Sequence, residues 1–286
     1  MSFILKVVKK IFRPLLTDML FKRQALYKLV TNNFVEKNEL KKLYYNKVYL
    51  NSSAKTIIES TYFLGKPIKI TDSFWYLHSL TELFIDETYC FKATTNEPLI
   101  IDCGSNIGLS IIYFKRLYPE AKVIGFEPDK DIFKKLQHNV AQFNLSKLEL
   151  HQKAVWVNNE PLLFQQNGSL GGHITSNASS NTIKVETIRL RDLLNQKVDF
   201  LKIDIEGPEY DIIKDCEDLL SNVDNLFIEY HSFHENEQMI GELLMMIKKA
   251  GFKIYIKEAW ENMNKPFVEK KGPYFDLQLN IFGYRR

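Results

Sequence analysis

The sequence predicts an α/β fold, built on a doubly wound sheet of mostly parallel strands and preceded by a helical N-terminal extension. From residue 99 onward, short apolar runs alternate with segments of helical periodicity, the pattern of a parallel sheet flanked by helices. The length of 286 residues and the 45% hydrophobic content suffice for one large buried core. The first apolar run also ends in a glycine turn that opens a helix, as in nucleotide-binding sheets.

The composition excludes several classes of protein. The three cysteines have no C-x-x-C spacing, which argues against a disulfide framework or a cysteine zinc site and favours a reduced, cytoplasmic setting. No apolar run reaches the 18 residues of a membrane span. Residues 1–55 hold twelve Lys and Arg against three Asp and Glu, so the remaining chain is acidic although the net charge is +3. A nucleic-acid groove in the main domain is therefore not expected.

Residues 1–72 are expected to form a basic, mainly helical extension. Between residues 2 and 13, Ile4, Leu5, Val8, Ile11 and Phe12 share one helical face, and Lys6, Lys9, Lys10 and Arg13 share the other. This composition is that of a helix lying at a membrane surface, here the inner face. Packing on the protein's own core and a homodimer contact remain open alternatives.

The elements follow in order after this extension. The aromatic-rich segment 73–98 is expected to brace the core, which spans 99–258 and is followed by a C-terminal strand hairpin over 259–286. Apolar runs predict strands, and 3.6-residue periodicity predicts helices. The strands are predicted at 99–103, 122–127, 148–155, 162–165, 183–187, 198–204, 226–231, 252–256 and 274–284, and the helices at 106–118, 130–143, 208–220 and 238–250.

The glycine turn runs from Asp102 to Gly108 with the sequence DCGSNIG. Gly104 allows a sharp turn and close approach of a ligand, Asn106 is suited to cap the helix, and Gly108 is expected to let that helix pack closely on the strand. A dinucleotide site requires G-x-G-x-x-G, but Asn106 stands in place of the second glycine. No triphosphate loop is present in the sequence either. The turn therefore suits a nucleoside ligand without phosphates.

Glu127 ends the second predicted strand, 23 residues after Gly104. A carboxylate at this position can accept hydrogen bonds from two vicinal ribose hydroxyls.

These motifs together resemble those of FkbM-type S-adenosyl-L-methionine-dependent methyltransferases over about residues 80–256. The matching stretches are IIDCGSNIG, VIGFEPD, VETIRLRDLL, VDFLKIDIEGPEYDII and LFIEYH, of which KIDIEGPEY is the most specific. The resemblance implies a Rossmann-like class I methyltransferase domain over 73–286, with seven strands and an antiparallel last strand. It also implies that Asp102, Gly104, Asn106 and Gly108 line the methionine and ribose, that Glu127 holds the ribose, and that Lys153 and Ala154 border the adenine.

Charged residues converge at the carboxyl ends of two later strands. Asp204, Glu206 and Glu209 follow one strand, and Glu229 and His231 end the next. Carboxylates near a sulfonium stabilise its positive charge, and Asp204 is expected to contact the cofactor. His231 is the preferred general base because its ordinary pKa of about 6.5 lies near the working pH. Asp204 is the second choice, with Glu229 beside them.

The acceptor is expected to contact Glu206 and Glu209, together with Ser169 and His173 of a Gly/Ser-rich loop. Asp204, Glu206, Glu229 and His231 alternatively suit a divalent metal, although no tight ligand spacing in the sequence supports a metal site.

The resulting prediction is an O-methyltransferase acting on a hydroxyl of a saccharide, a glycan precursor or another small molecule. N-methylation by the same fold, a nicotinamide-dependent oxidoreductase and a non-catalytic nucleoside-binding protein remain alternatives.

Overall fold

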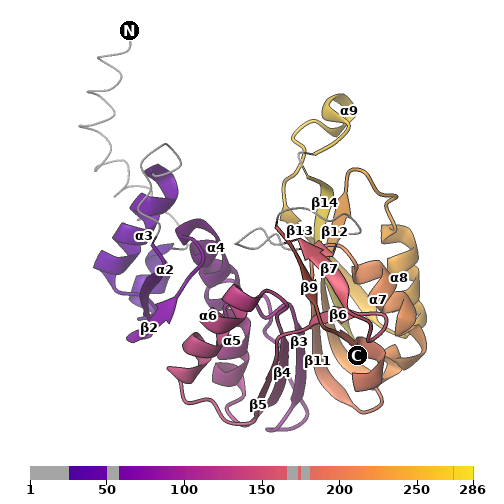
Figure 1. Ribbon diagram of the computed structural model, residues 1–286, viewed down its shortest axis with the longest axis horizontal. Helices are drawn as coiled ribbons and strands as arrows, with labels where there is room; N and C mark the ends of the chain where they lie inside the picture. Colours follow the sequence, from indigo (N-terminus) through magenta and orange to yellow (C-terminus); the bar gives the residue numbers. More distant parts are fainter. Residues whose placement is uncertain (1–25, 50–57, 166–172, 175–180, 273, 286) are drawn as a thin grey trace. The chain divides into compact units, whose positions relative to one another are not determined.

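The computed structural model describes residues 26–49, 58–165, 173–174, 181–272 and 274–285 (Figure 1). The amphipathic segment 2–13 and the predicted acceptor residue Ser169 lie outside the described residues. The chain divides into two compact units, Met1–Thr88 and Tyr89–Arg286. Within the described ranges, no helix has the length and apolar character needed to cross a bilayer.

The first unit contains helices and one hairpin. Its elements are α2 (Leu26–Thr31), α3 (Lys37–Tyr49), the antiparallel pair β1 (Ser60–Phe63) and β2 (Lys66–Lys69), and α4 (Ser73–Phe84). The hairpin was not expected. Its turn, Leu64-Gly65, has positive φ at both residues, which is the conformation that a two-residue hairpin turn requires.

Helix α4 belongs to this first unit, so the unit ends after Thr88 and not after residue 72 as expected from the sequence. Asp72 caps the helix by accepting from the Trp75 N–H. Phe84 packs against Phe34 and Phe63, with ring centroids 5.3 and 4.8 Å apart. These aromatic contacts join α4 to the preceding elements, and sequence spacing does not reveal them.

The second unit is built on a seven-stranded sheet of order β13-β14-β12-β11-β3-β4-β5 (Figure 1). The strands are β3 (Leu99–Cys103), β4 (Lys122–Phe126), β5 (Leu148–His151), β11 (Val198–Ile203), β12 (Val223–Phe233), β13 (Lys253–Trp260) and β14 (Phe275–Tyr284). Within this sheet, the neighbouring strands β5, β4, β3, β11 and β12 run parallel to one another. Strand β14 is antiparallel to both of its neighbours. The predicted doubly wound sheet with an antiparallel last strand is therefore confirmed.

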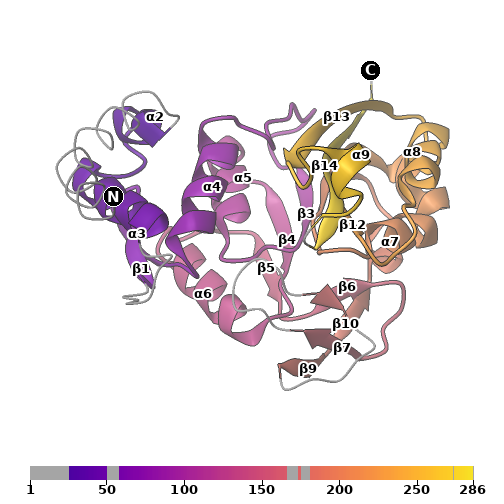
Figure 2. The same ribbon diagram turned by 90° about the horizontal axis from the view of Figure 1, so that it is seen from above.

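Helices cover both faces of this sheet (Figure 2). Helices α5 (Leu109–Leu117) and α6 (Lys130–Ala141) lie on one face, and α7 (Glu209–Asp215) and α8 (Ile240–Lys249) lie on the other. The predicted helix 208–220 is interrupted at Cys216, where the short 3₁₀ helix η2 (Glu217–Asn222) follows α7. A four-residue helix, α9 (Pro266–Glu269), lies between β13 and β14.

The predicted strand 148–155 is two strands in different sheets. The chain leaves the main sheet after β5 and forms β6 (Ala154–Trp156), which pairs in parallel with β10 (Thr187–Arg189). The second small sheet holds β7 (Leu162–Gln165), β8 (His173–Ile174) and β9 (Thr182–Val185). The 3₁₀ helix η1 (Leu190–Leu193) then leads into β11.

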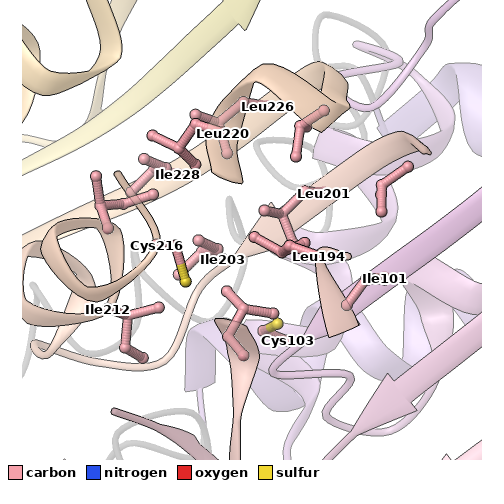
Figure 3. Close-up of a cluster of buried hydrophobic side chains, with 14 of the residues drawn as sticks. Ile101, Cys103, Leu194, Leu201, Ile203, Ile212, Cys216, Leu220, Leu226 and Ile228 are labelled. Carbon is pink, nitrogen blue, oxygen red and sulfur yellow. The ribbon is translucent and has the colours of Figure 1, made fainter. Parts of the chain in front are cut away.

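The strand alternation sorts side chains between the two faces of the main sheet. One buried cluster contains side chains of three strands and of α7: Ile101 and Cys103 of β3, Leu201 and Ile203 of β11, Leu226 and Ile228 of β12, and Ile212 of α7 (Figure 3). Leu243 of α8 belongs to the same cluster. The neighbours of the strand residues along each strand point to the opposite face, and these include Asp102, Lys202, Glu229 and His231. The polar residues therefore lie together, beside β3 and β11, where the winding of the sheet reverses.

Candidate active site

The glycine turn after β3 is shaped by contacts within the protein. Gly104 has φ +87°, and a Cβ at this position would lie 1.9 Å from the carbonyl oxygen of Asp204. Gly104 is therefore required because the backbone that follows β11 comes too close to leave room for a Cβ. This contact joins the turn after β3 to the turn after β11, the two segments that carry the predicted cofactor residues.

The predicted role of Asn106 as a helix cap is wrong. Asn106 has φ +45°, and its side-chain oxygen accepts from the Ile107 N–H at 2.7 Å, while Gly108 caps α5 without a side chain. Gly108 has φ +89°, and a Cβ there would lie 2.7 Å from Cδ1 of Leu136 in α6. Gly108 therefore permits packing on helix α6, and the expected close contact with the strand is also wrong.

Glu127 lies directly after β4, facing this turn. Its carboxylate accepts from the Asn106 N–H at 3.0 Å and from the Asp129 N–H at 2.9 Å. The residue is 6% exposed, and burial raises the pKa of its carboxyl group to about 8. Each backbone N–H occupies one carboxylate oxygen, so both oxygens retain acceptor capacity for ribose hydroxyls.

Lys202 is a site residue that the sequence analysis missed. Its Nζ lies 3.3 Å from Asp102 and 3.2 Å from Asp204, and it donates to the Gly104 carbonyl at 2.8 Å. Burial alone would lower the pKa of Lys202, but the two carboxylates raise it above its ordinary value. The available signal was a lysine inside the otherwise apolar strand VDFLKI, where every residue is buried.

The side chain of Asp102 contacts residues that hold the glycine turn in place. Its side chain is fully buried; Oδ2 accepts from the Ser110 hydroxyl at 2.6 Å, and Oδ1 faces Lys202 without a hydrogen bond from any described residue. This placement makes Asp102 a support for Lys202 and α5. The expected contact of Asp102 with the methionine and ribose stays a prediction.

The second group of charges surrounds His231 near the end of β12. Its Nδ1 lies 3.0 Å from Glu209, and its Nε2 lies 3.4 Å from Glu229 and 3.5 Å from Glu206. The ring is buried, whereas the side chains of Asp204, Glu206 and Glu229 keep 25%, 17% and 20% of their surface exposed. The predicted convergence of four carboxylates and one imidazole is present, and Asp204, Glu206 and Glu229 form its open side.

These carboxylates alter the protonation of the histidine. Burial alone would lower the pKa of His231, but Glu206 and Glu209 raise it well above the ordinary value. Burial and the neighbouring acids raise the pKa of Glu206 to about 8 and also raise that of Glu229. The choice of His231 as general base assumed a pKa of about 6.5, and this site does not provide that condition.

Glu209 is placed to hold His231. It is fully buried at the start of α7, and its Oε1 accepts from the Gly207 N–H at 2.9 Å as well as facing the ring. The predicted contact of Glu209 with the acceptor is therefore corrected to a supporting role.

The remaining predicted residues belong to the segments around β6 and β8. Lys153 lies between β5 and β6, and Ala154 is buried in β6, where its N–H donates to the Glu186 carbonyl at 2.9 Å. His173 is described only as part of the backbone of β8, which pairs with β7. The structure thus brings the glycine turn, Glu127 and the two charged groups together at the carboxyl edge of the sheet.

In this sheet the antiparallel strand β14 lies between β12 and β13, and the turn after β3 lacks the G-x-G-x-x-G motif of dinucleotide sites. These features define a Rossmann-like class I methyltransferase. Comparison with known proteins identifies the family. Residues 102–254, just over half of the chain, match the methyltransferase FkbM domain, and the chain belongs to that family.

Two sequence relatives agree with this assignment, and one solved structure is more distant in sequence. Methyltransferase 1 of Beauveria bassiana is 27% identical over 209 residues, covering 64% of this chain and 77% of its own. The 2-O-methyltransferase NoeI of Sinorhizobium fredii is 26% identical over 156 residues, covering 47% of this chain and 63% of its own. The crystal structure of the FkbM methyltransferase from Methylobacillus flagellatus has 15% identity and a TM-score of 0.46, and the match covers 68% of this chain and 45% of that one. The protein is an S-adenosylmethionine-dependent methyltransferase.

Proposed function

We propose that the protein methylates a hydroxyl group on a saccharide, a glycan precursor or another small molecule. The observation that carries this proposal is a group of three partly exposed carboxylates beside the glycine turn after β3, namely Asp204, Glu206 and Glu229. Carboxylates can accept hydrogen bonds from hydroxyls and can take up the hydroxyl proton. The relative NoeI is itself a 2-O-methyltransferase, which supports an oxygen acceptor.

The cofactor is bound by the first group of residues. When bound, S-adenosylmethionine supplies an electrophilic methyl group on a sulfonium. Glu127 would accept hydrogen bonds from the two ribose hydroxyls, and the turn at Gly104 would follow the methionine. Asp204, at the open side of the Lys202 ion pairs, would face the positive sulfonium and stabilise it.

The acceptor is aligned and deprotonated by the second group. The acceptor oxygen forms a bond to the methyl carbon as the carbon–sulfur bond breaks, and the sulfur keeps the electron pair. We assign the uptake of the hydroxyl proton to a carboxylate oxygen of Glu229, because burial and Asp204 raise its pKa and so increase its basicity. The ring of His231 lies 3.4 Å from this carboxylate and restricts its orientation.

Cofactor binding tests the first part of this proposal. Isothermal titration calorimetry of the full chain should show S-adenosylmethionine binding, and Glu127→Ala should weaken it. Two hydrogen bonds to a neutral carboxyl group contribute about 0.5–1.5 kcal/mol each, so a loss of about 5- to 150-fold is expected. Glu261→Ala, at an exposed position, is the matched control. Unchanged affinity of Glu127→Ala would refute the ribose contact.

Methyl transfer tests the second part. Incubation with methyl-labelled cofactor and a panel of saccharides, other alcohols and amines should label an alcohol. Glu229→Gln should keep cofactor binding while transfer falls about 10²–10⁴-fold, the usual contribution of a general base. Asp204→Asn should weaken cofactor binding as well, because it removes the charge that faces the sulfonium. Labelling of amines alone would replace this proposal with N-methylation.

A further inference from the structure

The ring of His231 is held in a fixed orientation by a buried carboxylate. Glu209 is fully buried, and its Oε1 faces Nδ1 at 3.0 Å while also accepting from the Gly207 N–H. A carboxylate at Nδ1 favours the proton on that nitrogen and leaves the Nε2 lone pair at the opposite edge of the ring. Histidines that bind metal ions are commonly oriented by such a carboxylate.

The other edge of the ring faces further acceptor atoms. Nε2 lies 3.5 Å from an oxygen of Glu206 and 3.4 Å from an oxygen of Glu229. These separations exceed the usual N–H···O range of about 2.7–3.2 Å. Asp204, Glu206 and His231 each place one donor atom within 4.8 Å of the others.

The 3.5 Å separation between Nε2 of His231 and the Glu206 oxygen suits two atoms that share a cation. Two ligand atoms that each lie about 2.1 Å from one ion are about 3.0 Å apart at a right angle and about 3.4 Å apart at a tetrahedral angle. Lys202 lies on the side of Asp204 that faces Asp102, and within the described residues it is the only lysine paired with this group. Four carboxylates consequently face one imidazole around His231.

We propose that Asp204, Glu206 and His231 form a divalent cation site, with Glu209 as the residue that positions the imidazole. Two carboxylates and one imidazole suit an ion that accepts oxygen and nitrogen ligands, such as manganese. The three ligands come from the turn after β11 and from β12, so the ion would lie at the carboxyl edge of the sheet. There it would bind the acceptor oxygen and lower the pKa of the hydroxyl, a role that rests on the proposed function.

Binding of Mn²⁺ to the full chain without cofactor tests the site directly. Electron paramagnetic resonance should show loss of the free Mn²⁺ signal with one saturable site. Glu206→Gln should weaken binding at least tenfold. Glu209→Gln should weaken it about 10–100-fold, as is typical when the partner of a metal-binding histidine is removed. Glu235→Gln, with a side chain 83% exposed, should bind as the parent does.

Magnetic resonance of the parent provides a second measurement that does not depend on the variants folding. Mn²⁺ should broaden the imidazole resonances of His231 before those of His138. Absence of saturable Mn²⁺ binding, or equal binding by parent and Glu206→Gln, would overturn the proposal. Because the acceptor panel is measured separately, failure of the metal site and failure of the proposed function give different results: the first appears as absence of saturable Mn²⁺ binding, and the second as labelling of amines alone.

Discussion

Lys202 shows how one buried cation can stabilise a charged site. It is 2% exposed and lies between Asp102 and Asp204, so both carboxylates depend on it for compensation. Removing one partner from a buried ion pair leaves an uncompensated charge and destabilises a protein by about 3–5 kcal/mol.

We therefore expect Lys202→Met to lower the free energy of unfolding by about 3–5 kcal/mol, measured by urea denaturation. Lys197→Met is the matched control, because Lys197 precedes the same strand, is 58% exposed and pairs with Asp224. An exposed pair contributes about 0–1 kcal/mol. Equal effects of the two substitutions would show that the Lys202 ion pairs add little.

Glu127 predicts a specific dependence of stability on pH. Its pKa is raised to about 8 in the folded protein from an ordinary value of 4.5, chiefly by burial. Between these values the unfolded chain has released the proton that the folded protein retains. Stability due to Glu127 therefore falls as the pH rises from about 4.5 to about 8.

Glu127→Gln removes this titration. Urea unfolding at about pH 5, 6.5 and 8 should show that the stability of the parent relative to the variant decreases with rising pH. A constant difference across this range would mean that Glu127 is ionised throughout.

At the scale of elements, helix α6 is linked to the cofactor turn through its N-terminus. Asp129 caps α6 by accepting from the Asp131 and Ile132 N–H groups, and its own N–H donates to Glu127. The cap therefore orients both the helix and the carboxylate assigned to the ribose.

Asp129→Ala should lower stability by about 1–2 kcal/mol, the usual effect of losing an N-cap side chain. It should also weaken cofactor binding, because without the cap the backbone holds the N–H that donates to Glu127 less firmly. Asp131→Ala in the first turn of the same helix is the control, since that residue is exposed. Both variants can be compared by thermal unfolding and calorimetry. If Asp129→Ala binds the cofactor as tightly as the parent does, the helix cap does not contribute to the cofactor site.

At the scale of the whole molecule, positive charge is concentrated at the N-terminus. Residues 1–55 carry an excess of nine positive charges, whereas the rest of the chain carries an excess of six negative charges. Residues 2–13 remain the predicted membrane contact, and each basic residue near an anionic surface adds about 1 kcal/mol of attraction.

Sedimentation with anionic vesicles tests this contact. The full chain should pellet with the vesicles at low salt and less at high salt, because salt screens the attraction. A variant that begins at Thr17 should remain in the supernatant. Equal recovery of both proteins in the supernatant at low salt would exclude the membrane contact.

The sequence by itself determined the α/β class and the position of the site. The apolar runs predicted the strands of the main sheet, and because parallel strands end at one edge, Gly104, Glu127, Asp204 and His231 were expected to meet there. The stretch KIDIEGPEY was specific enough to indicate the family. These inferences needed only local periodicity and motifs.

The tertiary structure alone decided what each charged residue contacts. Lys202 donates to the Gly104 carbonyl across 98 positions of the chain, and Glu209 faces His231 across 22. Such contacts depend on strand register and on which face of the sheet each side chain occupies. The carboxylates of Glu206 and Glu209 raise the pKa of His231 although burial alone would lower it, and these carboxylates come from residues distant from His231 in sequence.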